Sequence, residues 1–169
     1  LGDIDLAGPM LAAGSLTKTG LNTLTLSGNN AGFSGTLQIN SGMLKLGDAN
    51  ALGSATAPTI VASGAVLDLN GVNTSEPITL SGVGLLGSGA FAFSGAAPSS
   101  QGALINSAPL AAAVSGSLTL LATTLIGSNY VNALSGVSEG GPIALNAPVS
   151  GAFVLGKVGS NLLTLTAPN

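Results

Sequence analysis

The sequence lacks the side chains on which most enzymatic chemistry depends. Its 169 residues include no cysteine and no histidine, and only three basic and six acidic residues. Without histidine no side chain has an ordinary pKa near neutrality, and without cysteine there is no thiolate nucleophile, thiolate metal site or disulfide. Serine and threonine are abundant, but none has an obvious base beside it. The composition therefore predicts a protein that is not an enzyme, with no catalytic residue, no metal site and no cofactor.

Basic residues and long apolar runs are scarce too. All three basic residues are lysines, which is too few for a nucleic-acid footprint, so no nucleic-acid partner is expected. No charge occurs from Pro77 to Ser138, and the most apolar part, Leu110 to Ile126, has about the length of a short membrane-spanning helix. It is interrupted by Ser115-Gly116-Ser117, however, and then alternates apolar and polar residues. We therefore expect no transmembrane span, but a surface with almost no charge to repel a neighbouring molecule.

Glycine and short apolar alternations are what the sequence has in quantity. Hydrophobic residues make up 46% of the chain, so a core can form, whereas 26 scattered glycines make long helices costly, at about 1 kcal/mol each relative to alanine. Triplets of two aliphatic residues around a mostly polar one recur between turn-forming Gly, Ser and Asn, which is typical of short strands with one side in a core. The triplets are Leu24-Thr25-Leu26, Leu37-Gln38-Ile39, Leu44-Lys45-Leu46, Leu67-Asp68-Leu69, Ile78-Thr79-Leu80, Leu118-Thr119-Leu120, Ile143-Ala144-Leu145 and Leu163-Thr164-Leu165.

The spacing of the triplets predicts a solenoid. The triplets that start at Leu24, Leu37 and Leu44 complete a cycle of about twenty residues, which suits one turn of a right-handed parallel β-helix. We therefore predict an all-β fold, a right-handed parallel β-helix (β-solenoid) of about eight turns stacked about 4.8 Å apart. Residues 1–169 are expected to form a single β-solenoid segment, with an irregular, loop-rich insertion over residues 83–113.

The chain also repeats itself. Residues 16–30 align without gaps on residues 155–169, which lie 139 positions later, and eight of the fifteen positions are identical. The identical pairs include Lys18/Lys157, Gly20/Gly159 and Asn22/Asn161. Because the chain ends by restarting its own pattern and begins with Leu1, we interpret it as one segment of a longer repetitive array.

Few polar residues are candidates for chemistry. Asp3 and Asp5 lie on the same side of an extended segment, where we expect a solvated strand face. Two alternatives are a catalytic carboxylate pair that hydrolyses glycosides and a weak calcium site, although calcium wants more oxygen ligands than two carboxylates. Alternation sends Asp68 outward if Leu67 and Leu69 are in the core.

Lysines and asparagines are expected to be structural. We predict that Lys18, Lys45 and Lys157 are surface groups, and that the shared lysine of the repeat reflects a shared turn geometry. Asparagines near turns are predicted to stack as ladders that bond the backbone of adjacent turns. These asparagines are Asn22, Asn29, Asn30, Asn40, Asn50 and Asn70.

The block from Gly14 to Gly53 carries three successive motifs. They are Lys18-Thr19-Gly20, Leu24-Thr25-Leu26-Ser27-Gly28-Asn29 and Leu46-Gly47-Asp48-Ala49-Asn50-Ala51-Leu52-Gly53. In this order they resemble the autotransporter-associated β-strand repeat of large bacterial surface proteins, best over residues 14–53, partly over 155–169 and hardly in the middle. The resemblance implies a β-helical segment of a secreted or surface-displayed passenger, outside the cell or on the outer face of a Gram-negative-type bacterium. That repeat carries no catalytic residues, so it implies none here.

Two functions follow as hypotheses. The first is a structural extracellular or surface β-solenoid that acts as a stalk, an adhesin or a self-assembling filament subunit, with copies of itself as partners through end-to-end stacking or strand exchange. The alternative is a β-helix that binds or cleaves carbohydrate, with cell-surface glycans as partners. Sugar sites usually include aromatic platforms, and the outward candidates in this sequence are Tyr130 and Phe33.

Overall fold

The computed structural model describes residues 2–85, 102–127 and 140–168, and every regular element in these ranges is a short β-strand. The strands form three sheets in which all pairings are parallel. The first sheet contains, in spatial order, β1 (Ile4–Leu6), β3 (Thr23–Leu26), β5 (Gly42–Leu46), β7 (Ala65–Asp68), β9 (Leu104–Ile105), β12 (Thr124–Ile126) and β15 (Leu155–Lys157). The second contains β2 (Leu16–Lys18), β4 (Leu37–Ile39), β6 (Thr59–Val61), β8 (Ile78–Leu80), β11 (Leu118–Leu120) and β14 (Val149–Ser150). The third contains β10 (Ala112–Val114), β13 (Ile143–Leu145) and β16 (Leu163–Leu165).

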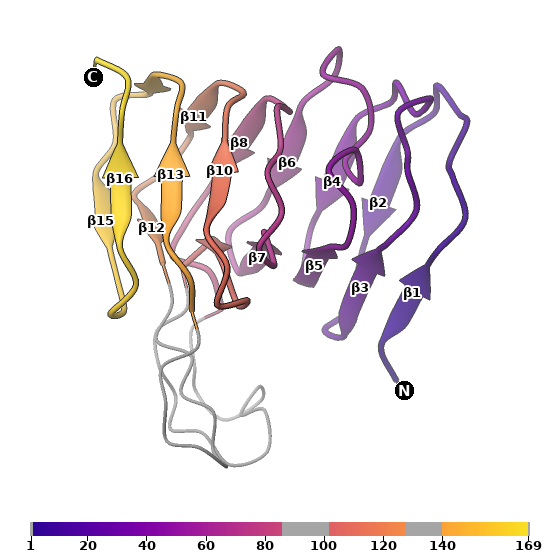
Figure 1. The fold of residues 1–169 in the computed structure, drawn as a ribbon, viewed down its shortest axis with the longest axis horizontal. Helices are drawn as coiled ribbons and strands as arrows, with labels where there is room; N and C mark the ends of the chain where they lie inside the picture. The colour runs from indigo at the N-terminus through magenta and orange to yellow at the C-terminus, as the bar shows by residue number, and fades with distance from the viewer. Residues whose placement is uncertain (1, 86–101, 128–139, 169) are drawn as a thin grey trace.

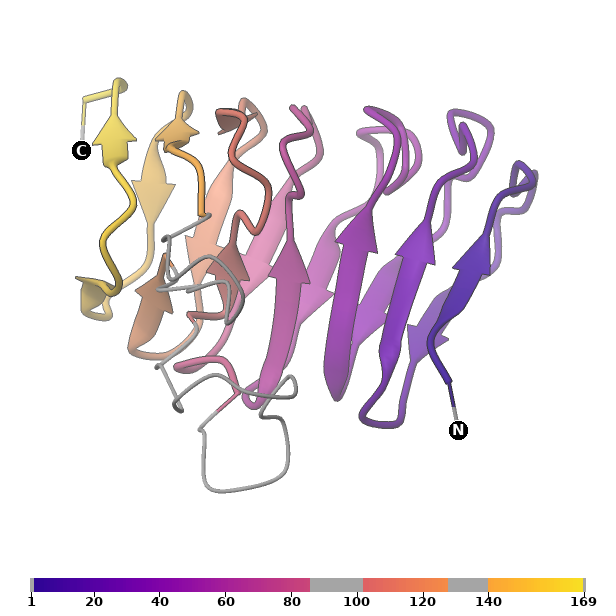
Figure 2. The ribbon, with the colours of Figure 1, turned by 60° about the horizontal axis from the view of Figure 1, so that its bottom comes forward.

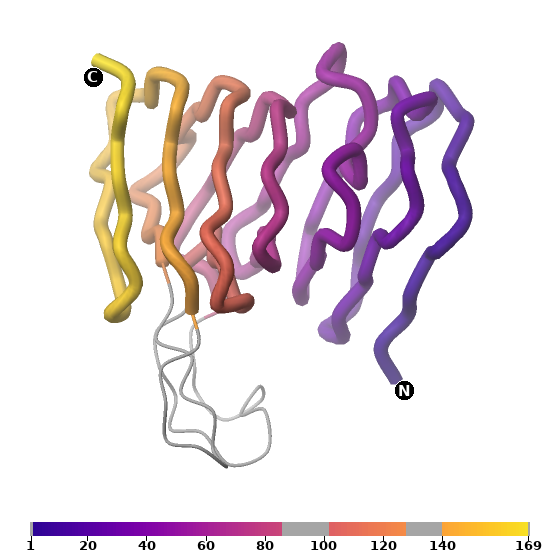
Figure 3. The backbone as a smooth tube through the Cα atoms, viewed as in Figure 1, coloured from indigo at the N-terminus to yellow at the C-terminus, as the bar shows by residue number. Residues whose placement is uncertain are grey.

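The chain winds through these sheets as a parallel β-solenoid, which confirms the predicted fold class. Successive strands of one sheet come from successive turns, so the colour runs steadily from indigo to yellow along the stack (Figures 1 and 2). The tube through the Cα atoms shows the coils lying side by side with the two termini at opposite ends (Figure 3). In the first turns, Ile4 pairs with Leu24 and Leu24 with Leu44. Two partners in a row are thus twenty positions apart, the period that the triplets predicted.

The seven strands of the first sheet correspond to seven turns within the described residues, where a uniform period would give about eight. The period lengthens at two places. Leu67 pairs with Leu104, and Ile126 pairs with Lys157. These two turns therefore contain more residues than the others. Within the stretch 83–113, for which the sequence predicts an insertion, residues 86–101 lie outside the described part of the chain. β9 and β10 belong to that stretch and stand in the stack.

Alternation decides which side chains form the core. In the second sheet, β4, β6, β8 and β11 show the pattern buried, half-buried, buried, as in Ile78-Thr79-Leu80, because successive side chains point to opposite faces. The inward residues of neighbouring strands lie in register and form aliphatic ladders, such as Ile39, Val61, Leu80 and Leu120. Burying each of these side chains contributes roughly 1.5–3 kcal/mol. These ladders, joined in one hydrophobic cluster, run along the inside of the stack.

Glycine corners let the chain return in register. Gly42 begins β5 with φ of 72°, a backbone conformation that favours glycine. A Cβ atom built on Gly42 would lie 2.5 Å from the carbonyl oxygen of Gly20, which occupies the corner one turn earlier. The corners are thus in direct backbone contact, and a side chain at Gly42 would force neighbouring turns apart.

No helix that is long and apolar enough to cross a membrane occurs among the residues that the structure describes.

Replacing a ladder residue should be costly, whereas its outward neighbour should tolerate change. Leu80 is fully buried, and Leu80→Ala is expected to lower the free energy of unfolding by about 2–5 kcal/mol, because it leaves a cavity between adjacent turns. Thr79→Ala, on the outward side of the same strand, should change it by less than about 0.5 kcal/mol. Denaturant unfolding followed by circular dichroism measures both, and equal losses would contradict the assignment of the inner face.

Candidate functional site

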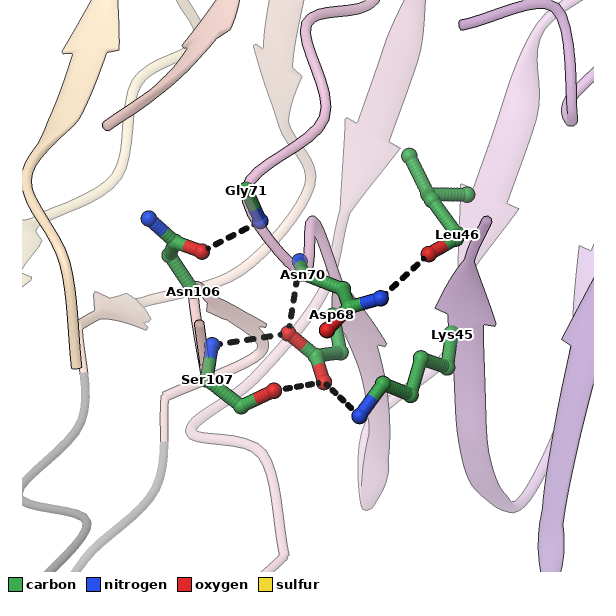
Figure 4. Close-up of polar contacts among 7 residues, drawn as sticks. All are labelled: Lys45, Leu46, Asp68, Asn70, Gly71, Asn106 and Ser107. Carbon is green, nitrogen blue, oxygen red and sulfur yellow. Dashed lines mark hydrogen bonds and ion pairs between the residues drawn. The ribbon is translucent and has the colours of Figure 1, made fainter. Parts of the chain in front are cut away.

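The most extensive polar cluster of the described residues surrounds Asp68 (Figure 4). One carboxylate oxygen of Asp68 accepts hydrogen bonds from the backbone N–H groups of Asn70 (3.0 Å) and Ser107 (2.9 Å). The other accepts a hydrogen bond from the Ser107 hydroxyl (2.6 Å) and lies 4.0 Å from the Lys45 ammonium. The carboxylate therefore holds together groups from three successive turns.

Asp68 points outward, as alternation predicts, but this outward side chain is buried rather than exposed to solvent. The side chain does point away from the main core, because Leu67 and Leu69 on either side are fully buried. It is nevertheless only 1% exposed. A second apolar cluster of Met43, Val66 and Ile105 lies on this outer side of the first sheet, where Leu85 packs against it. The alternation of residue types distinguishes the inner face of the sheet from its outer face. It does not show whether residues of a later turn cover that outer face.

Asn106 connects further turns beside this carboxylate. Its side-chain oxygen accepts a hydrogen bond from the Gly71 N–H (2.7 Å), and its amide donates to the carbonyls of Leu110 (2.7 Å) and Pro142 (3.0 Å). Asn106 is fully buried, so these three bonds satisfy polar groups that have no access to water. No local pattern predicted the role of Asn106, because this residue lies in the stretch that was predicted to be an insertion.

Three of the six asparagines predicted to form ladders bond the backbone of adjacent turns, namely Asn22, Asn30 and Asn70. Asn30 accepts from Met10 N–H (2.8 Å) in the preceding turn and donates to the Ala51 carbonyl (2.8 Å) in the following one. Asn70 donates to the Leu46 carbonyl (2.9 Å) and Asn22 to the Gly2 carbonyl (2.9 Å). These partners are main-chain groups, so the asparagines act as clamps between turns rather than as stacked amide ladders. Asn29 and the backbone of Asn50 make local turn bonds instead.

Lys18 is buried, which overturns its prediction as a surface group. Residue 18 is level with Ile39 on the inward side of the second sheet. Its ammonium bends to the corner and donates to the carbonyls of Thr19 (3.3 Å), Gly20 (2.7 Å) and Ser41 (3.0 Å), the last of which belongs to the next turn. Burial lowers the pKa of Lys18, and the nearby charge of Asp3 opposes that shift. Lys45 is partly exposed beside Asp68, and Lys157 is exposed, as predicted.

The internal repeat encodes a corner. Lys157 donates to the carbonyl of Gly159, just as Lys18 does to Gly20, and both glycines have positive φ, of 74° and 77°. Asn22 and Asn161 each donate to a carbonyl twenty residues earlier. The first corner joins the second sheet to the first, whereas the second joins the first sheet to the third. The shared lysine thus reflects a shared turn geometry, as predicted, and this geometry serves two different corners of the solenoid.

Asp3 and Asp5 are exposed, and both bond to the following turn. Asp3 accepts a hydrogen bond from the Thr23 N–H (2.8 Å), and Asp5 accepts one from the Ser27 hydroxyl (2.6 Å). Within residues 2–85, 102–127 and 140–168, no three His, Cys, Asp or Glu side chains gather where they might hold a metal ion. The pair is therefore a strand face near one end of the stack, with roles in joining the first two turns.

The aromatic candidates for a sugar platform fare differently. Phe33 is only 3% exposed and packs in the main core, so its prediction as an outward residue is wrong. Tyr130 lies outside the described residues. Phe153, which the sequence did not single out, is 50% exposed near the C-terminal end of the stack.

Among the carboxylates of the described residues, Glu76 alone is buried with an oxygen that has no hydrogen-bond partner. It is 2% exposed, and its Oε2 has no hydrogen-bond partner, nor does the hydroxyl of buried Thr59. Both side chains are inward, because Glu76 continues the alternation of Ile78 and Leu80, and Thr59 is level with Ile78. Burial raises the pKa of Glu76. The sequence does contain a signal for a buried Glu76, because this acidic residue lies two positions before the inward Ile78 and must therefore point to the same side of the chain.

Comparison with known proteins supports the autotransporter resemblance over half of the chain. The chain is 36% identical over 84 residues to the adhesin BmaC autotransporter of Brucella suis biovar 1 (strain 1330). That alignment covers 50% of this chain and 2% of the Brucella protein, so the chain spans only a small part of that relative's length. No family model matches the sequence, and no solved structure matches it. The similarity and the parallel stack together suggest an adhesin-type passenger β-helix.

Removing the Asp68 carboxylate should destabilise the middle of the stack. Asp68→Ala is expected to lower the free energy of unfolding by about 2–4 kcal/mol, because the half-buried N–H and hydroxyl groups of Ser107 and the N–H of Asn70 lose their acceptor. Asp5→Ala removes a carboxylate with one hydroxyl bond at an exposed position and should cost less than about 1 kcal/mol. Urea unfolding of the two variants measures the difference. Equal losses in the free energy of unfolding would show that the cluster around Asp68 does not stabilise the fold more than the exposed Asp5 does.

Glu76 should make stability depend on pH. Because its folded pKa is raised above its ordinary value of 4.5, the folded state favours the protonated acid. The favourable contribution is complete below about pH 4.5 and is lost as the pH rises through the raised pKa. Glu76→Gln, which cannot ionise, should be more stable than the parent at neutral pH, and the gap should close as the pH falls. A gap between the two unfolding free energies that is the same at all pH values would contradict this expectation.

Proposed function

We propose that this chain is a non-enzymatic segment of a bacterial surface adhesin, in which the β-solenoid serves as a stalk and offers its flank as an adhesive surface. The observation that carries the proposal is a parallel stack of turns in a chain similar over half its length to an autotransporter adhesin. Each turn adds about 4.8 Å to a rod, so the length of the stack is set by the number of its turns. The same similarity supports the proposal of a surface location, outside the cell or on the outer face of a Gram-negative-type bacterium.

The outer face of the second sheet is the surface best suited to adhesion. Its central row of outward residues carries no charge, and the strands that supply it are in parallel register. The row consists of Thr17, Gln38, Ile60, Thr79, Thr119 and Ser150. Regularly spaced hydroxyl, amide and methyl groups without net charge form a broad contact area with little desolvation cost.

The carbohydrate alternative receives no specific support from the described residues. Phe33 is in the core, and the central row of the second sheet has no aromatic side chain. A sugar-binding or sugar-cleaving role therefore stays a prediction that depends on Tyr130. Binding to a glycan array that is abolished by Tyr130→Ala would support a sugar-binding role. Release of reducing ends from a polysaccharide would support a sugar-cleaving role.

The adhesive role is tested on intact cells of the source bacterium. Antibodies raised against the purified chain should label unpermeabilised cells, and the soluble chain should compete with those cells for attachment to a host-cell layer. Labelling only after permeabilisation would contradict the surface location. If intact cells are labelled but the soluble chain does not compete for attachment, the result would be consistent with a stalk and would contradict an adhesive surface.

Charge inserted into the proposed face provides the matched comparison. The double variant Thr79→Lys, Thr119→Lys places two ammonium groups side by side on the outer row of the second sheet and should reduce competition at least several-fold. Thr25→Lys adds a charge on the outward side of the first sheet and should compete like the parent. Equal competition by all three proteins would exclude the second sheet as the adhesive face.

A further inference from the structure

The corner after β7 contains the only Asn-Gly pair of the sequence, Asn70-Gly71. Both residues have positive φ, of 49° and 75°, and across them the Val72 N–H donates a hydrogen bond to the Leu69 carbonyl (2.8 Å). Positive φ at two successive central residues is the pattern of a type I′ turn, for which Asn-Gly is a preferred sequence. The turn explains why the pair is there, but the pair also has a chemistry of its own.

That chemistry is deamidation within the chain. A backbone nitrogen can attack the carboxamide carbon of the asparagine before it, and glycine places no side chain in the way. A bond then forms between Gly71 N and Asn70 Cγ, the Cγ–Nδ2 bond breaks, and the proton of the Gly71 nitrogen leaves with Nδ2 as ammonia. Water opens the resulting cyclic imide at either carbonyl, which yields aspartate or isoaspartate. Both residues are half-buried, so water, the only other reactant, reaches the corner.

The fold ties the two reacting groups to different turns. The Gly71 N–H donates to the side-chain oxygen of Asn106 (2.7 Å) in the following turn, whereas the Asn70 amide donates to the Leu46 carbonyl (2.9 Å) in the preceding one. Figure 4 shows these two bonds directed to opposite sides of the corner. The reaction needs the attacking nitrogen aligned on the carbon at about 3–3.5 Å. While both bonds are intact, neither group is free to move into that arrangement.

Asn106 is well placed to act as a restraint. It is fully buried, and its amide donates to the carbonyls of Leu110 (2.7 Å) and Pro142 (3.0 Å). These two bonds fix the position of the oxygen that accepts from Gly71, because the amide group is planar and cannot turn without breaking them.

The products of deamidation do not suit this corner. A carboxylate at position 70 cannot donate to the Leu46 carbonyl, and it adds a negative charge next to Asp68, which already accepts a hydrogen bond from the Asn70 N–H (3.0 Å). Isoaspartate in addition lengthens the main chain by one carbon atom within a hydrogen-bonded turn. A corner that has reacted therefore closes less well than before.

We infer that Asn70-Gly71 is a self-modification site that the fold keeps inactive, that Asn106 is the residue that restrains it, and that deamidation marks chains in which this corner has opened. The chemistry starts from the opened corner, so its rate follows the population of that form. The inference rests on the geometry of one corner and is independent of the adhesive role.

Deamidation of the purified 169-residue chain tests the site. The parent is incubated at mildly alkaline pH with and without a denaturing concentration of guanidinium chloride, and mass spectrometry of proteolytic peptides follows each asparagine. In denaturant Asn70 should convert faster than any other asparagine, and Gly71→Ala should slow it, because the added methyl group hinders attack. In the folded chain Asn70 should convert more slowly by about tenfold or more, because two hydrogen bonds must first be broken. Equal rates with and without denaturant, or faster conversion at another asparagine, would overturn the inference whether or not any variant folds.

Removing the restraint separates the role of Asn106 from that of the fold as a whole. Asn106→Leu keeps the approximate size of the side chain but offers no acceptor to the Gly71 N–H, and it should speed conversion of Asn70 in the folded chain by about tenfold or more. Leu80→Ala, which destabilises the stack through its core, is the matched control. The two variants are compared at denaturant concentrations that give them the same free energy of unfolding, and Asn106→Leu should convert faster. Equal rates at equal stability would contradict the role of Asn106.

The modified chain provides a second readout. Deamidated and unmodified parent differ by one charge and can be separated by anion exchange. The deamidated fraction should unfold at a lower denaturant concentration than the unmodified one. Identical unfolding midpoints would contradict the expectation that the products do not suit the corner.

Discussion

The structure depends on one constraint, which is that every turn must bring the chain back beside itself in register. The backbone N–H and C=O groups of a strand in the stack can be satisfied only by the turns before and after it. The same registry aligns the inward aliphatic residues, so hydrogen bonding and burial are fulfilled by the same geometry. Corners therefore need residues that turn sharply in little space, as Gly42 does against Gly20. Added length is tolerated between strands, as in the long intervals from Leu67 to Leu104 and from Ile126 to Lys157.

Buried polar groups serve the same constraint. Asn30, Asn106 and Asp68 each satisfy backbone groups of adjacent turns at places where no strand pairing does so. They lie between turns and hold adjacent turns together. Glu76 and Thr59 depart from this pattern, because each has a buried oxygen without a partner in the interior. Both residues belong to neighbouring turns, because Thr59 pairs with Ile78, and each oxygen without a partner costs stability there.

The sequence predicted the fold well because a solenoid is encoded locally. Each triplet such as Ile78-Thr79-Leu80 specifies one strand and its inner face, and the regular spacing specifies the stacking. It failed where a residue's surroundings come from another turn. Asp68 is covered by Ser107, Lys18 bends back to the corner and is closed by Ser41, and Phe33 joins the core from a bend. None of these neighbours lies near enough in the sequence to appear in a local pattern, and the same is true of Asn106.

The direction of the interstrand hydrogen bonds gives the stack a particular mechanical character. The strands lie across the long axis, so the bonds between turns point along it (Figure 1). A force applied between the two ends therefore acts along these hydrogen bonds. It breaks them one turn at a time, in the unzipping geometry, instead of shearing all the bonds of a sheet together. Each turn that yields releases about twenty residues, or roughly 70 Å of extended chain. A stack built in this way is therefore expected to lengthen stepwise under tension while the turns that have not yielded keep their structure.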